Sequence, residues 1–177
     1  MLLFRNHLIA LVLVLSSISC SKEAPVKVDE QELITTVKLK IIAPDNTTQT
    51  VTWKETSPST PIQLSAGVKY EVTVSVLNES NPSKVVDITN EVKLEAEEHQ
   101  FFYEFSGINV NFVSGDSDVI DKEGYPLFYH TVWTARSSGS GTVQLYLIHE
   151  PTSKNSTNRV GFGGATDIQI EFNVLVE

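Results

Sequence analysis

Apolar side chains recur at every second position along most of this chain, and this period of two is the feature that most restricts its fold. It is clearest near the carboxyl end, where Ile168, Ile170 and Phe172 alternate with polar residues. Successive side chains of a strand point to opposite faces, so the alternation predicts strands with one buried and one solvated face. The pattern occurs in residues 35–41, 48–55, 70–76, 101–105, 108–112, 128–135, 143–147 and 168–176.

Turn residues separate these segments, and one stretch between them lacks the alternation. Residues 88–99 contain good helix formers, and Asp87 or Thr89 is placed to cap the first helical turn. We therefore expect a mostly β protein, an antiparallel, immunoglobulin-like β-sandwich of about eight strands with one short inserted helix at about 88–99. A small barrel is the alternative, because the Cys…Trp…Cys spacing of immunoglobulin domains is absent. Long loops are expected at 78–85, 114–125 and 150–166.

The amino-terminal residues have the composition of an export and anchoring segment. Arg5 precedes an apolar run at 8–15 that is too short to span a bilayer of about 30 Å. The triplet Ile18-Ser19-Cys20 resembles a lipobox, in which the cysteine thiol receives a diacylglycerol. We expect a signal peptide at 1–19, a lipidated Cys20 with a flexible tether at 20–32, and a single domain at 33–177. A cleavable signal with a chance cysteine is the alternative.

The overall composition argues against two classes of function. The chain of 177 residues has a formal net charge of −9 and lacks the clustered Lys and Arg that bind nucleic acid. Cys20 is the only cysteine, so no intramolecular disulfide can form and a hydrophobic core must stabilise the domain. The mature chain has neither a Gly-x-Ser-x-Gly elbow nor a free thiol nucleophile, which argues against an enzyme.

Six short segments occur in the same order in a family of small flavobacterial lipoproteins. They are ELITTV at 32–37, LNES at 77–80, DITNE at 87–91, AEEHQFF at 96–102, HEP at 149–151 and TDIQIEFNV at 166–174. The chain therefore resembles this uncharacterised Bacteroidetes family, some of whose members are labelled "type 1 periplasmic binding fold superfamily protein". The resemblance implies export and a lipid anchor. The fold in that label is a large two-lobed α/β structure, whereas this chain is short and has one predicted helix.

Two histidines and several acids lie near predicted strand ends. His149 ends a strand on the same face as its apolar residues, and Glu150 follows it. His99 lies four residues after Glu95, and Asp167 lies on the polar face of the last strand. If these ends converge, imidazole nitrogens and carboxylate oxygens would form a site for zinc or another divalent metal. The alternative is a histidine at the edge of the core that bonds to glutamate or backbone, with the acids solvated.

A second group of acids lies in the loop at 114–125. Asp116, Asp118, Asp121 and Glu123 offer several carboxylate oxygens in a short span, and calcium takes six to eight oxygen ligands. The loop lacks the ligand order of an EF-hand. It is therefore either a calcium-like site or a solvated acidic hairpin loop.

These features predict a lipid-anchored, non-catalytic binding or accessory module at the bacterial outer membrane, on its periplasmic or cell-surface side. We expect it to dock on an outer-membrane protein through its long loops. The alternative is a lipoprotein that captures a divalent, zinc-like metal through His99, His149 and nearby acids and feeds an outer-membrane receptor. The first function needs no cofactor, whereas the second needs the metal.

Overall fold

The computed structural model describes residues 33–55, 59–156 and 158–177, all of which belong to one compact unit, Gln31–Glu177. The predicted signal peptide, Cys20 and the tether up to residue 32 lie outside the described residues. Within the described ranges, no helix has the length and apolar composition needed to cross a membrane.

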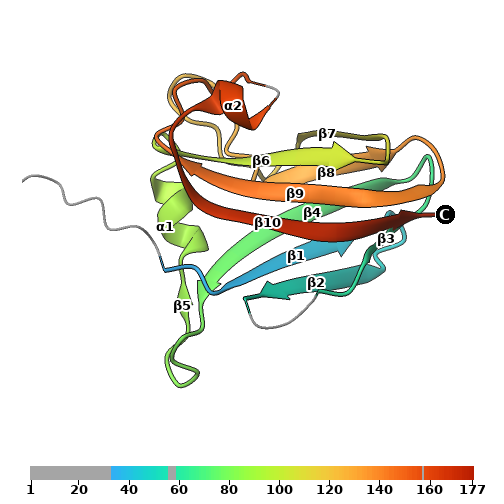
Figure 1. Cartoon of the computed structure of the whole chain (residues 1–177), viewed down its shortest axis with the longest axis horizontal. Helices are drawn as coiled ribbons and strands as arrows, with labels where there is room; N and C mark the ends of the chain where they lie inside the picture. The colour runs from blue at the N-terminus through green and yellow to red at the C-terminus, as the bar shows by residue number, and fades with distance from the viewer. Residues whose placement is uncertain (1–32, 56–58, 157) are drawn as a thin grey trace, which may run out of the picture. The chain divides into compact units, whose positions relative to one another are not determined.

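Ten strands and two short helices make up the described part of the chain (Figure 1). The strands are β1 (Thr36–Ile42), β2 (Thr48–Lys54), β3 (Ile62–Leu64), β4 (Lys69–Asn78), β5 (Val86–Asp87), β6 (His99–Ser106), β7 (Val110–Ser114), β8 (His130–Ala135), β9 (Gly139–His149) and β10 (Ala165–Val176). The helices are α1 (Thr89–Leu94) and α2 (Arg159–Phe162). The alternation did not predict β3 and β5, which have three and two residues, too few to display a period of two.

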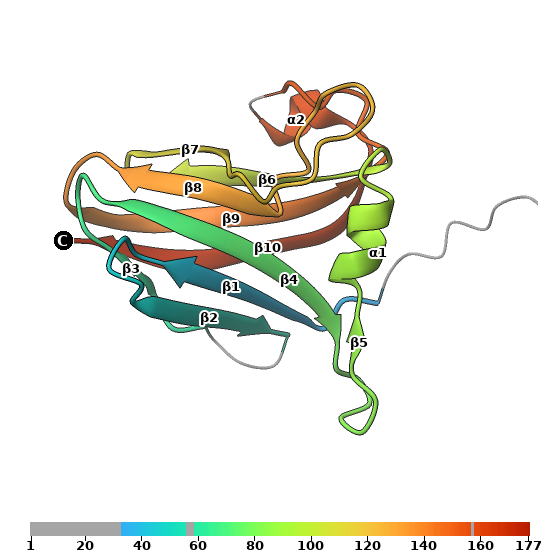
Figure 2. The ribbon, with the colours of Figure 1, turned by 180° about the vertical axis from the view of Figure 1, so that it is seen from behind.

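The strands form two sheets that pack face to face on one core (Figure 1, Figure 2). One sheet has the order β2-β1-β4-β8-β7, with β5 paired to β4, and the other has the order β3-β10-β9-β6. The paired strands are antiparallel except for β3 and β10, which run parallel. The orders β1-β4-β8-β7 and β10-β9-β6 correspond to the ABED and CFG sheets of constant-type immunoglobulin domains. The predicted immunoglobulin-like β-sandwich is therefore confirmed.

The inward faces of both sheets supply the core of the sandwich. Trp133 of β8 is fully buried and meets the rings of Tyr103 and Phe105 edge to face, with centroids 5.3 and 5.1 Å away. Every second residue of β10 from Ile168 to Val176 joins this core, as the alternation predicts. A fully buried apolar side chain contributes about 1.5–3 kcal/mol, so a core of this kind can stabilise the domain without a disulfide.

The first helix is shorter than the sequence predicts. It begins at Thr89, whose backbone N–H donates to the Asp87 carboxylate at 2.9 Å, and it ends at Leu94 instead of continuing toward His99. The backbone N–H of His99 still donates to the Glu95 carbonyl at 3.0 Å, but His99 already belongs to β6. Strand pairing with β9 therefore ends the helix earlier than its composition suggests. Figure 2 shows α1 at the end of the sandwich where β6 begins and β9 ends.

The second helix, α2, lies inside the long loop that was predicted at 150–166, so the prediction of a single helix was wrong. The Asn158 side chain caps α2 by accepting the Gly161 N–H at 2.9 Å. The helix buries Phe162 against Phe102 of β6, with ring centroids 4.2 Å apart. A four-residue helix has too few positions to show a helical period in sequence, and it forms because it covers the outer face of β6 and β9.

Candidate metal centre

The two predicted histidines lie directly opposite each other at the α1 end of the sandwich. His99 begins β6, His149 ends β9, and the two residues are partners in the antiparallel register. His99 shares the inward face of its strand with Phe101, and His149 shares that of Leu147, so both rings point the same way. The rings stack with centroids 4.7 Å apart and planes inclined by 12°. The convergence that a metal site would require is therefore present.

Asp167 joins the two histidines through a β-bulge. The register of β10 against β9 shifts between Thr166 and Ile168, so Asp167 is the extra residue. Its side chain is only 4% exposed, and its Oδ2 lies 3.6 Å from Nε2 of His99. The prediction that Asp167 lies on the polar face was wrong, because a bulge releases a residue from the alternation and redirects its side chain. Glu171, further along the same strand, is exposed.

The backbone carbonyl of Glu95 determines which nitrogen of His99 faces Asp167. This oxygen lies 3.2 Å from Nδ1 of His99 and can only accept, so Nδ1 carries the hydrogen. Nε2, the other ring nitrogen, then faces the Asp167 carboxylate. Metal-binding histidines usually donate their second ring N–H in this way. The Glu95 carboxylate lies on the other side, 3.8 Å from Nδ1, so the structure does not group Glu95 with the predicted ligands.

The predicted ligand Glu150 belongs to a second, more exposed group around His149. Potential ligand atoms of Glu98, His149 and Glu150 lie within 4.8 Å of one another, as do those of His99, His149 and Asp167. Glu98 Oε2 is 3.7 Å from Nε2 of His149. The predicted ligand set did not include Glu98, although Glu98 directly precedes His99 in the sequence. Its backbone carbonyl accepts the Glu150 N–H at 2.6 Å, which ties the two loops together.

The inner group, His99, His149 and Asp167, has the chemistry of a divalent metal site. Two imidazole nitrogens and one carboxylate oxygen come from three adjacent strands, and these atoms lie within 4.8 Å of one another. Zinc binds such atoms at about 2.0–2.2 Å, so small side-chain movements would complete the coordination. Three protein ligands leave the fourth position of a tetrahedral zinc ion open for water or another donor.

Lys154 braces the loops that carry the two histidines. Its ammonium donates to the Ala96 carbonyl at 2.6 Å and to the Asp121 carboxylate at 2.7 Å, and both charged side chains are almost completely buried. Burial alone would raise the pKa of Asp121, but hydrogen bonds from Lys154 and from the Tyr125 N–H outweigh it and lower that pKa. The hydrogen bond from Lys154 to Ala96 joins the segment after His149 to the segment before His99, and the ion pair with Asp121 holds Lys154 in place.

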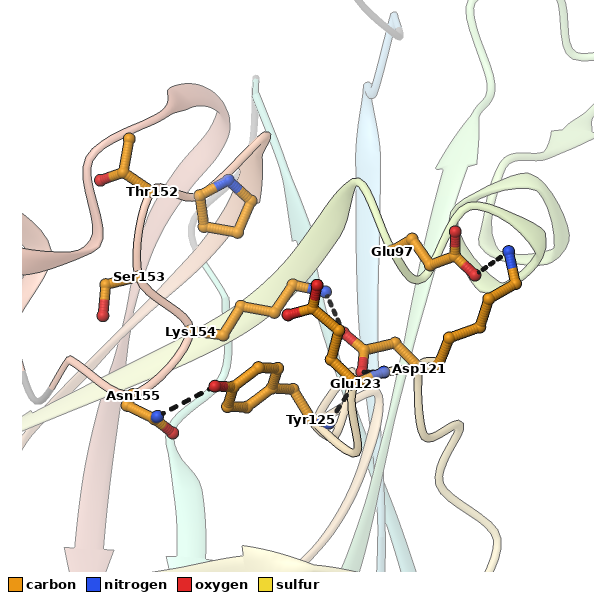
Figure 3. A pocket seen from close by; sticks show the side chains of 10 residues that line it. Glu97, Asp121, Glu123, Tyr125, Thr152, Ser153, Lys154 and Asn155 are labelled. Atoms are coloured by element: carbon orange, nitrogen blue, oxygen red, sulfur yellow. Dashed lines mark hydrogen bonds and ion pairs between the residues drawn. The ribbon is translucent and has the colours of Figure 1, made fainter.

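A polar pocket of about 450 Å³ lies beside this brace (Figure 3). Its lining includes Lys154 and Asp121, the ion pair of Lys122 with Glu97 at 2.5 Å, and the Tyr125 hydroxyl, which accepts from Asn155 at 3.3 Å. These polar groups already satisfy one another, so a ligand would have to displace existing contacts. The pocket is therefore a weaker candidate than the histidine cluster.

The acids of the predicted calcium-like loop serve different local purposes. Asp118 accepts hydrogen bonds from the backbone of its own loop and of residues 128–130, and Asp121 pairs with Lys154. Asp116 and Glu123 are exposed. Among the described residues, the groups of potential metal ligands that lie within 4.8 Å of one another do not include these four acids. The arrangement favours a loop organised by Asp118 over a calcium site.

Comparisons of the chain with protein-family models, with curated proteins and with solved structures found no match.

Proposed function

We propose that this protein captures a divalent, zinc-like metal ion with His99, His149 and Asp167. One observation carries the proposal: in a nearly buried position, ligand atoms of two imidazoles and one carboxylate lie within 4.8 Å of one another, with Nε2 of His99 3.6 Å from Oδ2 of Asp167. Imidazole nitrogens and carboxylate oxygens are the donors that zinc and other divalent transition metals take from proteins. A metal ion can bind all three side chains at once, whereas a proton on His99 would link only His99 and Asp167.

The setting of this function follows from the amino-terminal sequence. Cleavage before Cys20 and lipidation of its thiol would anchor the domain to the outer membrane through a tether of about a dozen residues. In that position the protein would take a metal ion from solution and deliver it to an outer-membrane receptor, without catalysis. The open coordination position of a three-ligand site supports delivery, because an acceptor can bind the ion before the donor releases it.

Docking on an outer-membrane protein is the second candidate function. The observation that favours it is a pair of exposed apolar side chains on the two helices: Leu94 of α1 is 88% exposed and Val160 of α2 is 92% exposed. Both helices lie toward the same end of the sandwich (Figure 1). Docking and metal delivery are compatible, since a receptor that contacts this end would also reach the site. Capture of an outer-membrane protein by the native chain, abolished in a Leu94→Glu/Val160→Glu variant, would support docking.

The metal content of the purified full chain tests the first proposal. We expect one zinc ion per chain by elemental analysis and by calorimetric titration after removal of bound metal. Replacing His99 or His149 by Ala, or Asp167 by Asn, should weaken zinc binding at least about tenfold. The matched control is Glu171→Gln, which removes an acid from the exposed face of the same strand and should leave binding unchanged.

Two outcomes would contradict the metal proposal. If the native chain binds no zinc at micromolar concentrations, the contact of His99 with Asp167 is a structural ion pair. If Glu171→Gln weakens binding as much as Asp167→Asn, zinc binds through general surface charge. Circular dichroism of each variant separates loss of a ligand from loss of the fold.

A further inference from the structure

The buried site shares one ligand with an exposed neighbour. His149 belongs both to the inner group with His99 and Asp167 and to the outer group with Glu98 and Glu150. We propose that Glu98, His149 and Glu150 form an entrance site, which binds the divalent cation from solution and passes it inward through the shared imidazole. This inference rests on the proposed metal function of the inner group.

The outer group is more exposed to solvent than the inner group, as a path for the cation from solution to the inner site requires. The side chains of His99 and Asp167 are each 4% exposed, and that of His149 is 13% exposed. The Glu98 side chain is 38% exposed, and Glu150 lies in the exposed class. A hydrated cation that went directly to the inner group would lose most of its water before new ligands replaced it, which is costly. Surface carboxylates replace part of that water first and attract the cation electrostatically.

The shared histidine makes the transfer a stepwise exchange of ligands. Glu98 Oε2 already lies 3.7 Å from Nε2 of His149, and the His149 ring stacks on His99 at 4.7 Å. An ion held by Glu98, His149 and Glu150 can keep His149 while Asp167 and His99 replace the two glutamates. No stage then leaves the cation without a protein ligand. The path ends where nitrogen ligands predominate, which favours a transition metal over the harder calcium or magnesium ions.

Backbone contacts hold the two glutamates in place for this role. The Glu150 N–H donates to the Glu98 carbonyl at 2.6 Å, so the loops that carry these residues are joined at this point. Glu150 has a φ of 46°, a left-handed conformation that glycine adopts most easily. A glutamate in this conformation is less favourable than a glycine, but it places a carboxylate next to His149, as an entrance site requires.

Zinc association kinetics test the entrance site in the full chain. We compare the double variant Glu98→Gln/Glu150→Gln with the matched control Glu97→Gln/Glu123→Gln, which removes the same charge from two neighbouring exposed acids. In stopped-flow mixing with zinc, the first variant should show association and dissociation rate constants that are both lower by about tenfold. Its equilibrium affinity should stay within about threefold of the native value, because an entrance site speeds both directions equally. The control should keep both rate constants within about twofold.

A second comparison uses the shared ligand. The His99→Ala variant should retain weak zinc binding at the outer group, and adding Glu150→Gln to it should abolish that remainder. Loss of affinity with an unchanged association rate in the Glu98/Glu150 variant would overturn the proposal and make these residues ligands of the final site. Unchanged rate constants, or a control that slows equally, would overturn it as well. Failure of the native chain to bind zinc would refute the metal function itself, which is a separate and distinguishable result.

Discussion

Replacing Asp118 by Ala, in the loop between β7 and β8, should destabilise the domain substantially. The Asp118 carboxylate accepts the backbone N–H groups of Phe128 and Tyr129 at 3.0 and 3.1 Å, and the Ser114 hydroxyl at 2.8 Å. It also accepts the Val119 N–H at 3.0 Å and lies 3.4 Å from that of His130. This one side chain therefore organises both ends of the loop and the entry into β8.

The size of the effect follows from the donors that would lose their acceptor. A buried donor without a partner costs about 1–3 kcal/mol, and water can reach part of this half-buried loop, so the low end applies to each. The three backbone donors alone then give about 3 kcal/mol for Asp118→Ala. Asp118→Asn keeps one acceptor oxygen and should cost about half as much. For a domain of this size, about 3 kcal/mol lowers the Tm by roughly 6–12 °C.

Urea unfolding followed by the fluorescence of the buried Trp133 measures this difference. The matched control is Asp116→Ala, an exposed acid of the same loop, which should change the free energy of unfolding by less than about 0.5 kcal/mol. Equal effects of the two substitutions would refute the reasoning. The reasoning would also be refuted if calcium stabilised the native chain but neither of the two variants, because the loop would then be a metal site.

Two further predictions concern ion pairs. Hydrogen bonds from Lys54, and then from Lys38 and Thr36, lower the pKa of Glu79 from its ordinary 4.5 to about 2. The stabilisation from Glu79 is therefore complete above about pH 4.5 and is lost as the pH falls toward 2. The urea midpoint of Glu79→Gln should therefore fall less steeply than that of the native chain between these two pH values. An equally steep fall in both proteins would contradict this role of Glu79. Lys154→Met should lower the free energy of unfolding by about 3 kcal/mol, because it leaves the Asp121 carboxylate buried with only backbone donors. The same substitution should weaken zinc binding by loosening the loops that carry the histidines. The control Lys122→Met breaks a pair whose lysine is 84% exposed and should cost less than about 0.5 kcal/mol, and similar losses in both variants would refute the role of the brace.

The sequence alone was sufficient to predict the class of fold. A period of two is a local property, because each strand must place its apolar residues on the side that is buried, whatever its neighbours are. Long strands such as β4 and β10 can therefore be predicted from the sequence. The short strands β3 and β5 and the helix α2 do not, because each forms only through its contacts with neighbouring elements.

The candidate site was predictable only in part, for the same reason. Alternation places His149 on the inward face of its strand without knowledge of any partner. The pairing of His99 with His149 depends instead on the register of β6 against β9, two strands far apart in the chain. The inward position of Asp167 depends on a bulge in β10 that the local pattern does not contain. Each residue carries its own preference for burial, and these preferences determine which face of a strand is inward. Register and bulge arise instead from the packing of whole strands. Only the tertiary structure therefore brought the three ligands together.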